Sequence, residues 1–135
     1  MEINFFFEGI EKFILNNNIN RKIEKIVHDE NYRTAELNFI FCSDEHILKI
    51  NKKYLNHDYY TDVISFNYNE KSKLAGDIFI SRDTVLYNAE KYNQSFDNEI
   101  QRVMIHGVLH LAGYNDISNE EKAVMKLKED EYLNS

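Results

Sequence analysis

Hydrophobic side chains recur along this chain with two periods, one of two residues and one of three to four. The shorter period is clearest at Ile3, Phe5 and Phe7, where hydrophobic and polar residues alternate. Alternation places successive side chains on opposite faces of an extended chain, so it predicts a half-buried β-strand. Four segments are predicted strands on this basis, at about residues 3–7, 37–41, 63–66 and 77–80.

The longer period predicts helices, because residues three and four apart share one face of a helix. The last helix has a clear start, since Ser118 is followed three residues later by Glu121, the pattern of a capping box. Five helices are expected, at about residues 19–27, 43–54, 82–93, 97–112 and 119–132.

The order of these elements predicts an α+β architecture. Strands and helices alternate at first and helices alone finish the chain, which favours a small mixed four-stranded sheet covered by about five helices, packed on one face. The helix at 97–112 is hydrophobic almost all round, so we expect it at the centre. A length of 135 residues suits a single domain covering residues 1–135.

Composition and charge narrow the possible functions. The formal net charge of −7 argues against a surface that is coated with nucleic acid, although it allows a local basic groove. No hydrophobic run approaches the roughly 20 residues that span a bilayer, and the first residues lack the pattern of a signal peptide. A single cysteine, Cys42, excludes an internal disulfide framework. A cytoplasmic protein with no membrane partner is therefore expected.

Two histidines four residues apart, His106 and His110, are the main candidates for chemistry. On a helix they lie on one face and can bind the same metal ion. Gly113 can end the helix and turn the chain, which could bring the Asp116 carboxylate back as a third ligand. Three protein ligands are typical of a catalytic zinc, whose fourth position stays open. The competing interpretation is a core helix with two buried, hydrogen-bonded histidines.

A metal with an open position favours hydrolysis, because it lowers the pKa of bound water to about 7. A metallopeptidase of the metzincin type is one alternative, since the spacing of His106, His110 and Asp116 follows the metzincin pattern. Such peptidases use a glutamate beside the first histidine as general base, and here that position is Gly107. The peptidase interpretation therefore lacks its base.

The same region resembles the YbeY family of bacterial rRNA maturation factors. The segment HGVLHLAGY at residues 106–114 matches most of that family's long motif H-G-x-L-H-L-x-G-Y-D-H, and the resemblance covers about residues 35–130. Three further blocks fall in the family's order, namely NKKY at 51–54, TDVISF at 61–66 and GDI at 76–78. The resemblance implies a zinc-dependent endoribonuclease specific for single-stranded RNA, which acts on the ribosome in rRNA maturation, including 16S rRNA 3′-end processing, and in ribosome quality control.

Two departures from the family pattern change what can be carried over. The family's third histidine falls on Asp116, and Asn115 stands where the motif has aspartate. Zinc remains the expected metal, although two histidines and one carboxylate also suit iron(II), and a carboxylate favours manganese more than a third histidine would. The family's arginine after the tyrosine aligned with Tyr54 is Leu55 here, so its role cannot be transferred.

Arg102, Asp62 and His57 are the candidate catalytic residues. Arg102 lies one helical turn before His106 and could supply the missing positive charge. Asp62 belongs to a matched block, and a histidine such as His57 can act as general acid or base. Tyr59 and Tyr60 could stack on unpaired bases. A further alternative is a non-enzymatic ribosome-associated factor whose metal only fastens the helix to the following loop.

Overall fold

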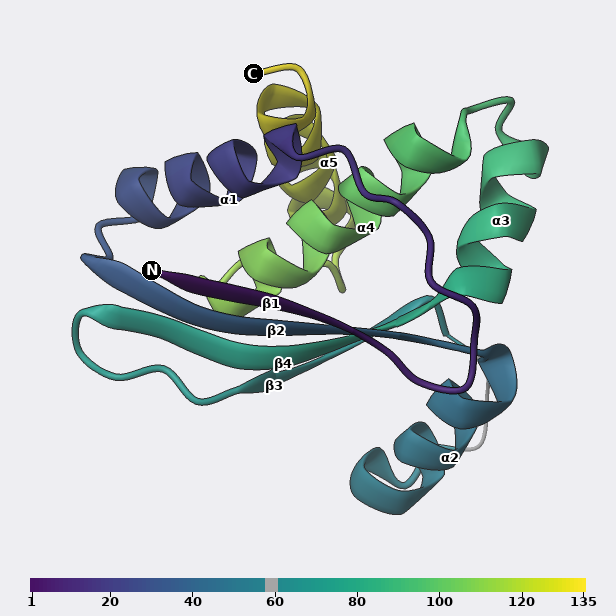
Figure 1. Cartoon of the computed structure of the whole chain (residues 1–135). Helices are drawn as coiled ribbons and strands as arrows, with labels where there is room; N and C mark the ends of the chain where they lie inside the picture. Colours follow the sequence, from purple (N-terminus) through teal and green to yellow (C-terminus); the bar gives the residue numbers. More distant parts are fainter. Residues whose placement is uncertain (58–60) are drawn as a thin grey trace.

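A four-stranded sheet with helices on both of its faces makes up the fold (Figure 1). The computed structural model describes residues 1–57 and 61–135. Its strands are β1 (Glu2–Phe7), β2 (Thr34–Cys42), β3 (Val63–Asn67) and β4 (Lys73–Ser81). Its helices are α1 (Asn18–Asp29), α2 (Asp44–Leu55), α3 (Arg82–Lys91), α4 (Phe96–Leu111) and α5 (Asn119–Leu133). The expected α+β class is confirmed, and the predicted elements lie within a few residues of these bounds.

The strand order is β1-β2-β4-β3, and the sheet is mixed as expected. β1, β2 and β4 run parallel, whereas β3 and β4 form an antiparallel hairpin. The helix α1 makes the crossover from β1 to β2. β3 therefore lies at an edge of the sheet, directly after the segment that follows α2. This edge is where the candidate site is built.

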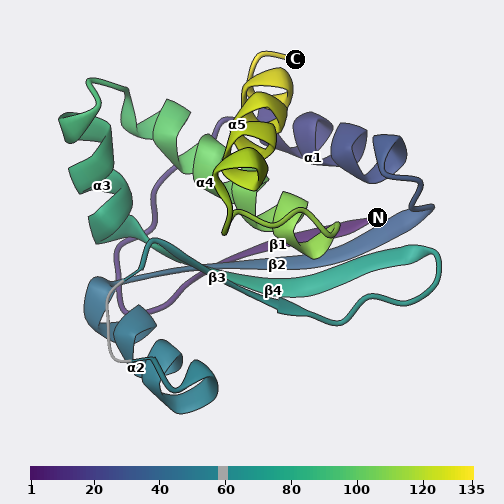
Figure 2. The same ribbon diagram turned by 180° about the vertical axis from the view of Figure 1, so that it is seen from behind.

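The central position of α4 is confirmed. Its buried side chains point both to the sheet and to the helices around it, and with α1 and α5 it covers one face of the sheet (Figures 1 and 2). Gly107 lets it come close to the sheet, since a Cβ atom there would lie 2.7 Å from Cγ2 of Ile78 on β4. The absence of a side chain at this position thus determines how near the two histidines lie to β3 and β4.

The expectation that helices pack on one face only is wrong. α2 lies on the opposite face of the sheet, below it in Figure 1, and forms a second small core with the end of the sheet. The reason is visible in β2, where Phe39, Ile40, Phe41 and Cys42 are all buried. Both faces of this end are hydrophobic, so both need a cover. The second core consists of Cys42, Ile47, Ile50 and Ile64.

Serine side chains begin four of the helices. Ser43, Ser81, Ser95 and Ser118 each accept a hydrogen bond from a backbone amide in the first helical turn, and the capping box of Ser118 and Glu121 is present. After α4 the chain turns at Gly113, whose φ of 108° is one that L side chains rarely adopt. The predicted start of α5 and the turn after α4 are therefore confirmed.

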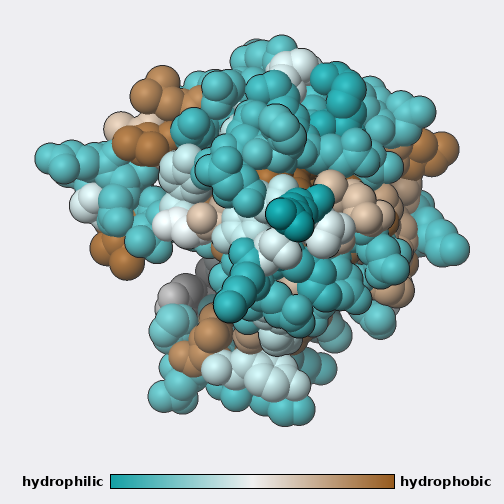
Figure 3. Space-filling view, turned by 90° about the vertical axis from the view of Figure 1, so that its left-hand side faces the viewer, coloured by the Kyte–Doolittle hydropathy of each residue, from teal (hydrophilic) through white to brown (hydrophobic). Residues whose placement is uncertain are grey.

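One face of the molecule shows how polar and hydrophobic residues are distributed on its surface. The face on the left of Figure 1 is covered mostly by polar residues, with hydrophobic residues scattered between them (Figure 3). None of the helices in residues 1–57 and 61–135 has the length and hydrophobicity needed to cross a bilayer.

Candidate metal centre

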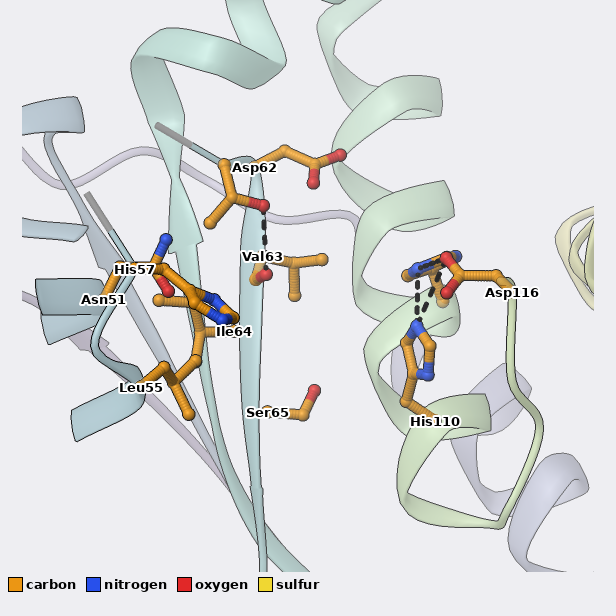
Figure 4. A pocket seen from close by; sticks show the side chains of 11 residues that line it. Asn51, Leu55, His57, Asp62, Val63, Ile64, Ser65, His110 and Asp116 are labelled. Atoms are coloured by element: carbon orange, nitrogen blue, oxygen red, sulfur yellow. Dashed lines mark hydrogen bonds and ion pairs between the residues drawn. The ribbon is translucent and has the colours of Figure 1, made fainter. Parts of the chain in front are cut away.

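Three side chains converge at the C-terminal half of α4. The Nε2 atoms of His106 and His110 lie 2.9 Å apart. Oδ2 of Asp116, from the turn after the helix, lies 3.3 Å from Nε2 of His106 and 3.5 Å from Nε2 of His110 (Figure 4). One nitrogen or oxygen atom from each residue therefore faces the same point.

This triangle has nearly the dimensions of a zinc site. Two ligand atoms about 2.05 Å from a tetrahedral zinc are about 3.3 Å apart. Both distances to Asp116 match this value, and the 2.9 Å between the nitrogens needs only a small outward movement of one ring. The three residues fit a metal ion, and they leave a fourth position open toward the cavity beside them.

Glu129 orients His106 from the side opposite to this triangle. Its Oε2 lies 2.6 Å from Nδ1 of His106, so the ring donates its Nδ1 proton to the carboxylate and keeps a lone pair on Nε2. Histidine ligands in proteins usually have such a partner on their second nitrogen. Burial lowers the pKa of His106, but the hydrogen bond and charge of Glu129, together with the charges of Asp62 and Asp116, outweigh burial and raise it. The same negative charges that favour a proton on this ring would favour a metal cation at Nε2.

The importance of Glu129 is not evident from the run of acidic residues around it. In the sequence, Glu129, Asp130 and Glu131 look like a solvated helix face. In the structure Glu129 is buried, with Met125 and Tyr132 on the same side of α5. These residues are spaced by four and three, so the helical register of Glu129 with its hydrophobic neighbours is the signal that could have identified it.

Arg102 lies on the α5 side of His106, away from the other two candidate ligands. Its guanidinium donates to Oε1 of Glu129 at 3.1 Å and to Oδ1 of Asp130 at 2.6 Å. It therefore holds the carboxylate that orients His106. The predicted one-turn spacing from His106 is correct, but the charge of Arg102 is directed to α5.

A cavity of about 440 Å³ opens in front of the three candidate ligands, between α4, β3 and the end of α2. We call it the histidine cavity (Figure 4). Asp62 and His57, the other two candidate catalytic residues, both line it. The lining residues are Asn51, Leu55, His57, Thr61, Asp62, Val63, Ile64, Ser65, His106, His110 and Asp116.

Asp62 and His57 occupy different walls of the histidine cavity. The carboxylate of Asp62 points toward α4, whereas His57 follows α2 and lies on the side away from His110 (Figure 4). Burial raises the pKa of Asp62, partly offset by the charge of His106. Leu55, at the position of the family arginine, also lines the cavity. Tyr59 and Tyr60 lie outside the described residues.

Comparison with known proteins identifies the family of the chain. A model of the family described as "Endoribonuclease YbeY" matches residues 7–135. Among relatives named Endoribonuclease YbeY, the protein of Karelsulcia muelleri is 48% identical over 133 residues, covering 97% of this chain and 93% of its own. That of Christiangramia forsetii is 46% identical over 134 residues, covering 98% and 92%.

The fold is shared with a protein from Thermotoga maritima whose structure was solved in solution. The two chains are 32% identical and superpose with a TM-score of 0.70, over 98% of this chain and 87% of the other. The match of nearly the whole chain to the family model and to these relatives confirms the resemblance seen in residues 106–114. The chain belongs to the YbeY family, whose members are named endoribonucleases.

Proposed function

We propose that this protein is a metal-dependent endoribonuclease that cuts single-stranded RNA in the histidine cavity. The observation that carries the proposal is the convergence of His106, His110 and Asp116, with Glu129 fixing the first of them. Relatives that match nearly the whole chain are named endoribonucleases, which supports RNA as the substrate.

Zinc is the proposed metal, held by Nε2 of both histidines and by the Asp116 carboxylate. When bound, zinc would lower the pKa of a water molecule and polarise the phosphodiester. Zinc accepts two histidines and a carboxylate in known hydrolases, and the near-tetrahedral spacing of the three atoms supports it here. The open side of the site faces the histidine cavity, where the scissile phosphate would lie.

The other site residues have separate proposed roles. Asp62 holds a proton to higher pH than an ordinary aspartate, so we assign it proton transfer at the reacting phosphate. His57, on the opposite wall, would exchange a proton with the leaving or attacking oxygen. Arg102 is a positioning residue, because it acts on His106 through Glu129.

The proposed biological setting is the cytoplasm, with rRNA as substrate and the small ribosomal subunit as partner. Maturation of the 3′ end of 16S rRNA and ribosome quality control fit a family of endoribonucleases. The −7 net charge suggests that contact with rRNA is local rather than spread over the surface.

The two alternatives are not favoured. A metzincin-like peptidase would need a general base at position 107, where the structure has a glycine packed against Ile78. A purely structural metal would not need an open cavity of about 440 Å³ at its fourth position.

The test combines metal content with RNA cleavage. Wild-type protein should contain about one zinc per chain and cut single-stranded RNA, while leaving duplex RNA and casein intact. His110→Ala and Asp116→Ala should lose both zinc and cleavage and keep a folded circular dichroism spectrum. His28→Ala is the matched control, since that side chain is 91% exposed, and it should behave as wild type. Cleavage that survives complete removal of metal would refute the proposal.

A further inference from the structure

A second cavity, of about 540 Å³, adjoins the metal centre on the other side. It lies between the end of α3, the first half of α4 and α5, and we call it the lysine cavity. His106 and Asp116 line both cavities. The candidate metal centre therefore lies between two cavities.

Some positively charged side chains in the lysine cavity form no ion pair within the described part of the chain. Lys122 and Lys126 lie one turn apart on α5, both are exposed, and neither ammonium has an ion-pair partner among residues 1–57 and 61–135. Arg102, in contrast, is committed to Glu129 and Asp130. Two lysines on one wall are thus available for an anionic ligand.

The acidic groups of this cavity are largely compensated. Glu129 is hydrogen-bonded to Arg102 and His106, and Asp116 faces the two imidazole rings. Glu99 is buried, and burial raises its pKa, while the nearby charge of Arg102 opposes this rise. The cationic side chains that line the cavity without an ion pair in the described part of the chain are therefore Lys122 and Lys126.

An aromatic ring completes the lysine cavity at the end of α3. Tyr92 lines it, and its side chain is 58% exposed. The ammonium of Lys91 lies 5.4 Å from its ring centroid, which gives the ring a cationic neighbour. Exposed aromatic rings beside lysines are the usual means by which proteins hold single-stranded nucleic acid, because bases stack and phosphates pair.

An endonuclease needs room for nucleotides on both sides of the scissile phosphate, and one cavity provides room on one side only. Resting on the function proposed above, we infer that the lysine cavity binds the RNA strand on one side of the cut. Lys122 and Lys126 contact backbone phosphates there, and Tyr92 stacks on a base. The strand on the other side of the cut lies in the histidine cavity.

The test separates RNA binding from the chemical step. Single-turnover cleavage of a single-stranded RNA is measured over a range of zinc-loaded protein concentrations, which gives a half-saturating concentration and a maximal rate. In Lys122→Ala/Lys126→Ala, the half-saturating concentration should rise while the maximal rate changes little. The logarithm of the half-saturating concentration is then plotted against the logarithm of the salt concentration. The slope of this plot should be lower by about 1.4 in the double variant, because two phosphate contacts on a single strand are lost.

Matched variants and substrates make the result specific. Tyr92→Ala should raise the half-saturating concentration roughly 5- to 100-fold, as loss of one stacked base predicts, and Tyr92→Phe should not. Lys128→Ala is the control, since that lysine lies on the same helix but pairs with Glu131. With RNA shortened on the side that enters the lysine cavity, wild type and the double variant should become alike.

The outcomes separate this inference from the proposed function. If the double variant and Tyr92→Ala match wild type in half-saturating concentration and salt slope, the lysine cavity does not bind RNA, and the endoribonuclease proposal stands. If wild-type protein cuts no RNA, the proposed function itself has failed. A lower maximal rate at an unchanged half-saturating concentration would also overturn the inference, because it would place these residues in the chemical step.

Discussion

At the scale of single residues, the candidate metal centre depends on a side chain that is not itself one of the three candidate ligands. Glu129 is buried between Arg102 and His106 and determines which nitrogen of His106 carries the proton. Removing its charge while keeping its shape should therefore weaken metal binding without unfolding the chain.

Glu129→Gln is predicted to lower zinc affinity roughly 10- to 100-fold, the usual effect of a substitution at the hydrogen-bond partner of a ligand histidine. Competition with a chromogenic chelator would measure the affinity directly. Glu131→Gln, on the exposed side of the same helix, should leave it unchanged. Unaltered affinity in Glu129→Gln would mean that the carboxylate does not orient His106.

Asp62→Asn is predicted to stabilise the protein while reducing cleavage. Because burial raises the pKa of Asp62, the folded state binds a proton more readily than the unfolded state, and stability contributed by this group falls as pH rises. In chelator, the melting temperature of Asp62→Asn should exceed that of wild type at pH 7, and the difference should shrink near pH 3.5. A lower melting temperature at pH 7 would contradict the assigned direction.

The sequence revealed part of this site and missed part, for a definite reason. His106 and His110 share a helix and the glycine that follows suggests the return of Asp116, so local geometry was sufficient to group them. Glu129 reaches His106 from another helix, 23 residues further along the chain. A contact between elements depends on how the helices pack, which no local pattern contains.

At the scale of elements, the distance between α4 and the sheet depends on Gly107. Gly107→Ala would place a Cβ 2.7 Å from Cγ2 of Ile78, and helix and strand would have to separate. Alanine favours a helix by up to about 1 kcal/mol. Overpacking a core costs about 1–3 kcal/mol, so we expect a net loss.

Denaturant unfolding would measure this loss, and a double variant would test its cause. Ile78→Ala removes the atom that collides with the new Cβ, so Gly107→Ala/Ile78→Ala should be less destabilised than the sum of the two single changes. Additive losses would show that the close approach at Ile78 is not responsible.

The first turns of α2 and α3 are joined by hydrogen bonds. The backbone amide of Asp44 donates to Oδ2 of Asp83 at 3.0 Å, while the hydroxyl of Thr84 donates to Oδ1 of Asp44 at 2.6 Å and that of Ser81 donates to the same oxygen. The carboxylate of Asp44 thus ties the start of α2 to that of α3.

Asp44→Ala is predicted to lower the free energy of unfolding by about 1–3 kcal/mol, because two hydroxyl donors lose a charged acceptor. Glu45→Ala, the next residue and exposed, is the control and should change it little. Zinc affinity should be unaffected in both variants, since the metal ligands lie on and after α4.

The fold class and element positions were predictable because hydrophobic periods specify them locally. The placement of α2 was not, although the chain holds a sign of it. The run Phe39, Ile40, Phe41 and Cys42 breaks the alternation of β2, and an unbroken hydrophobic run indicates a strand that is covered on both faces. The run does not indicate which helix packs on the second face, because that depends on the side of the sheet to which the chain turns after β2.

At the scale of the whole molecule, a bound metal should stabilise the fold without being required for it. The large core between α4, α1, α5 and the sheet contains none of the three candidate ligands. Zinc at 100 times its dissociation constant would add about 2.7 kcal/mol. A chelator should therefore lower the melting temperature by several degrees and leave the circular dichroism spectrum at 25 °C unchanged. Loss of secondary structure in chelator would support the structural role instead.

The buried position of α4 limits which substitutions evolution or protein engineering can introduce. The helix that bears both histidines has almost no surface of its own, so a substitution on it alters folding and chemistry together. The end of α2, the end of α3 and the exposed side of α5 border the two cavities outside the central core. Changes in RNA specificity should therefore arise by substitutions in these bordering segments, while the sequence of α4 stays unchanged.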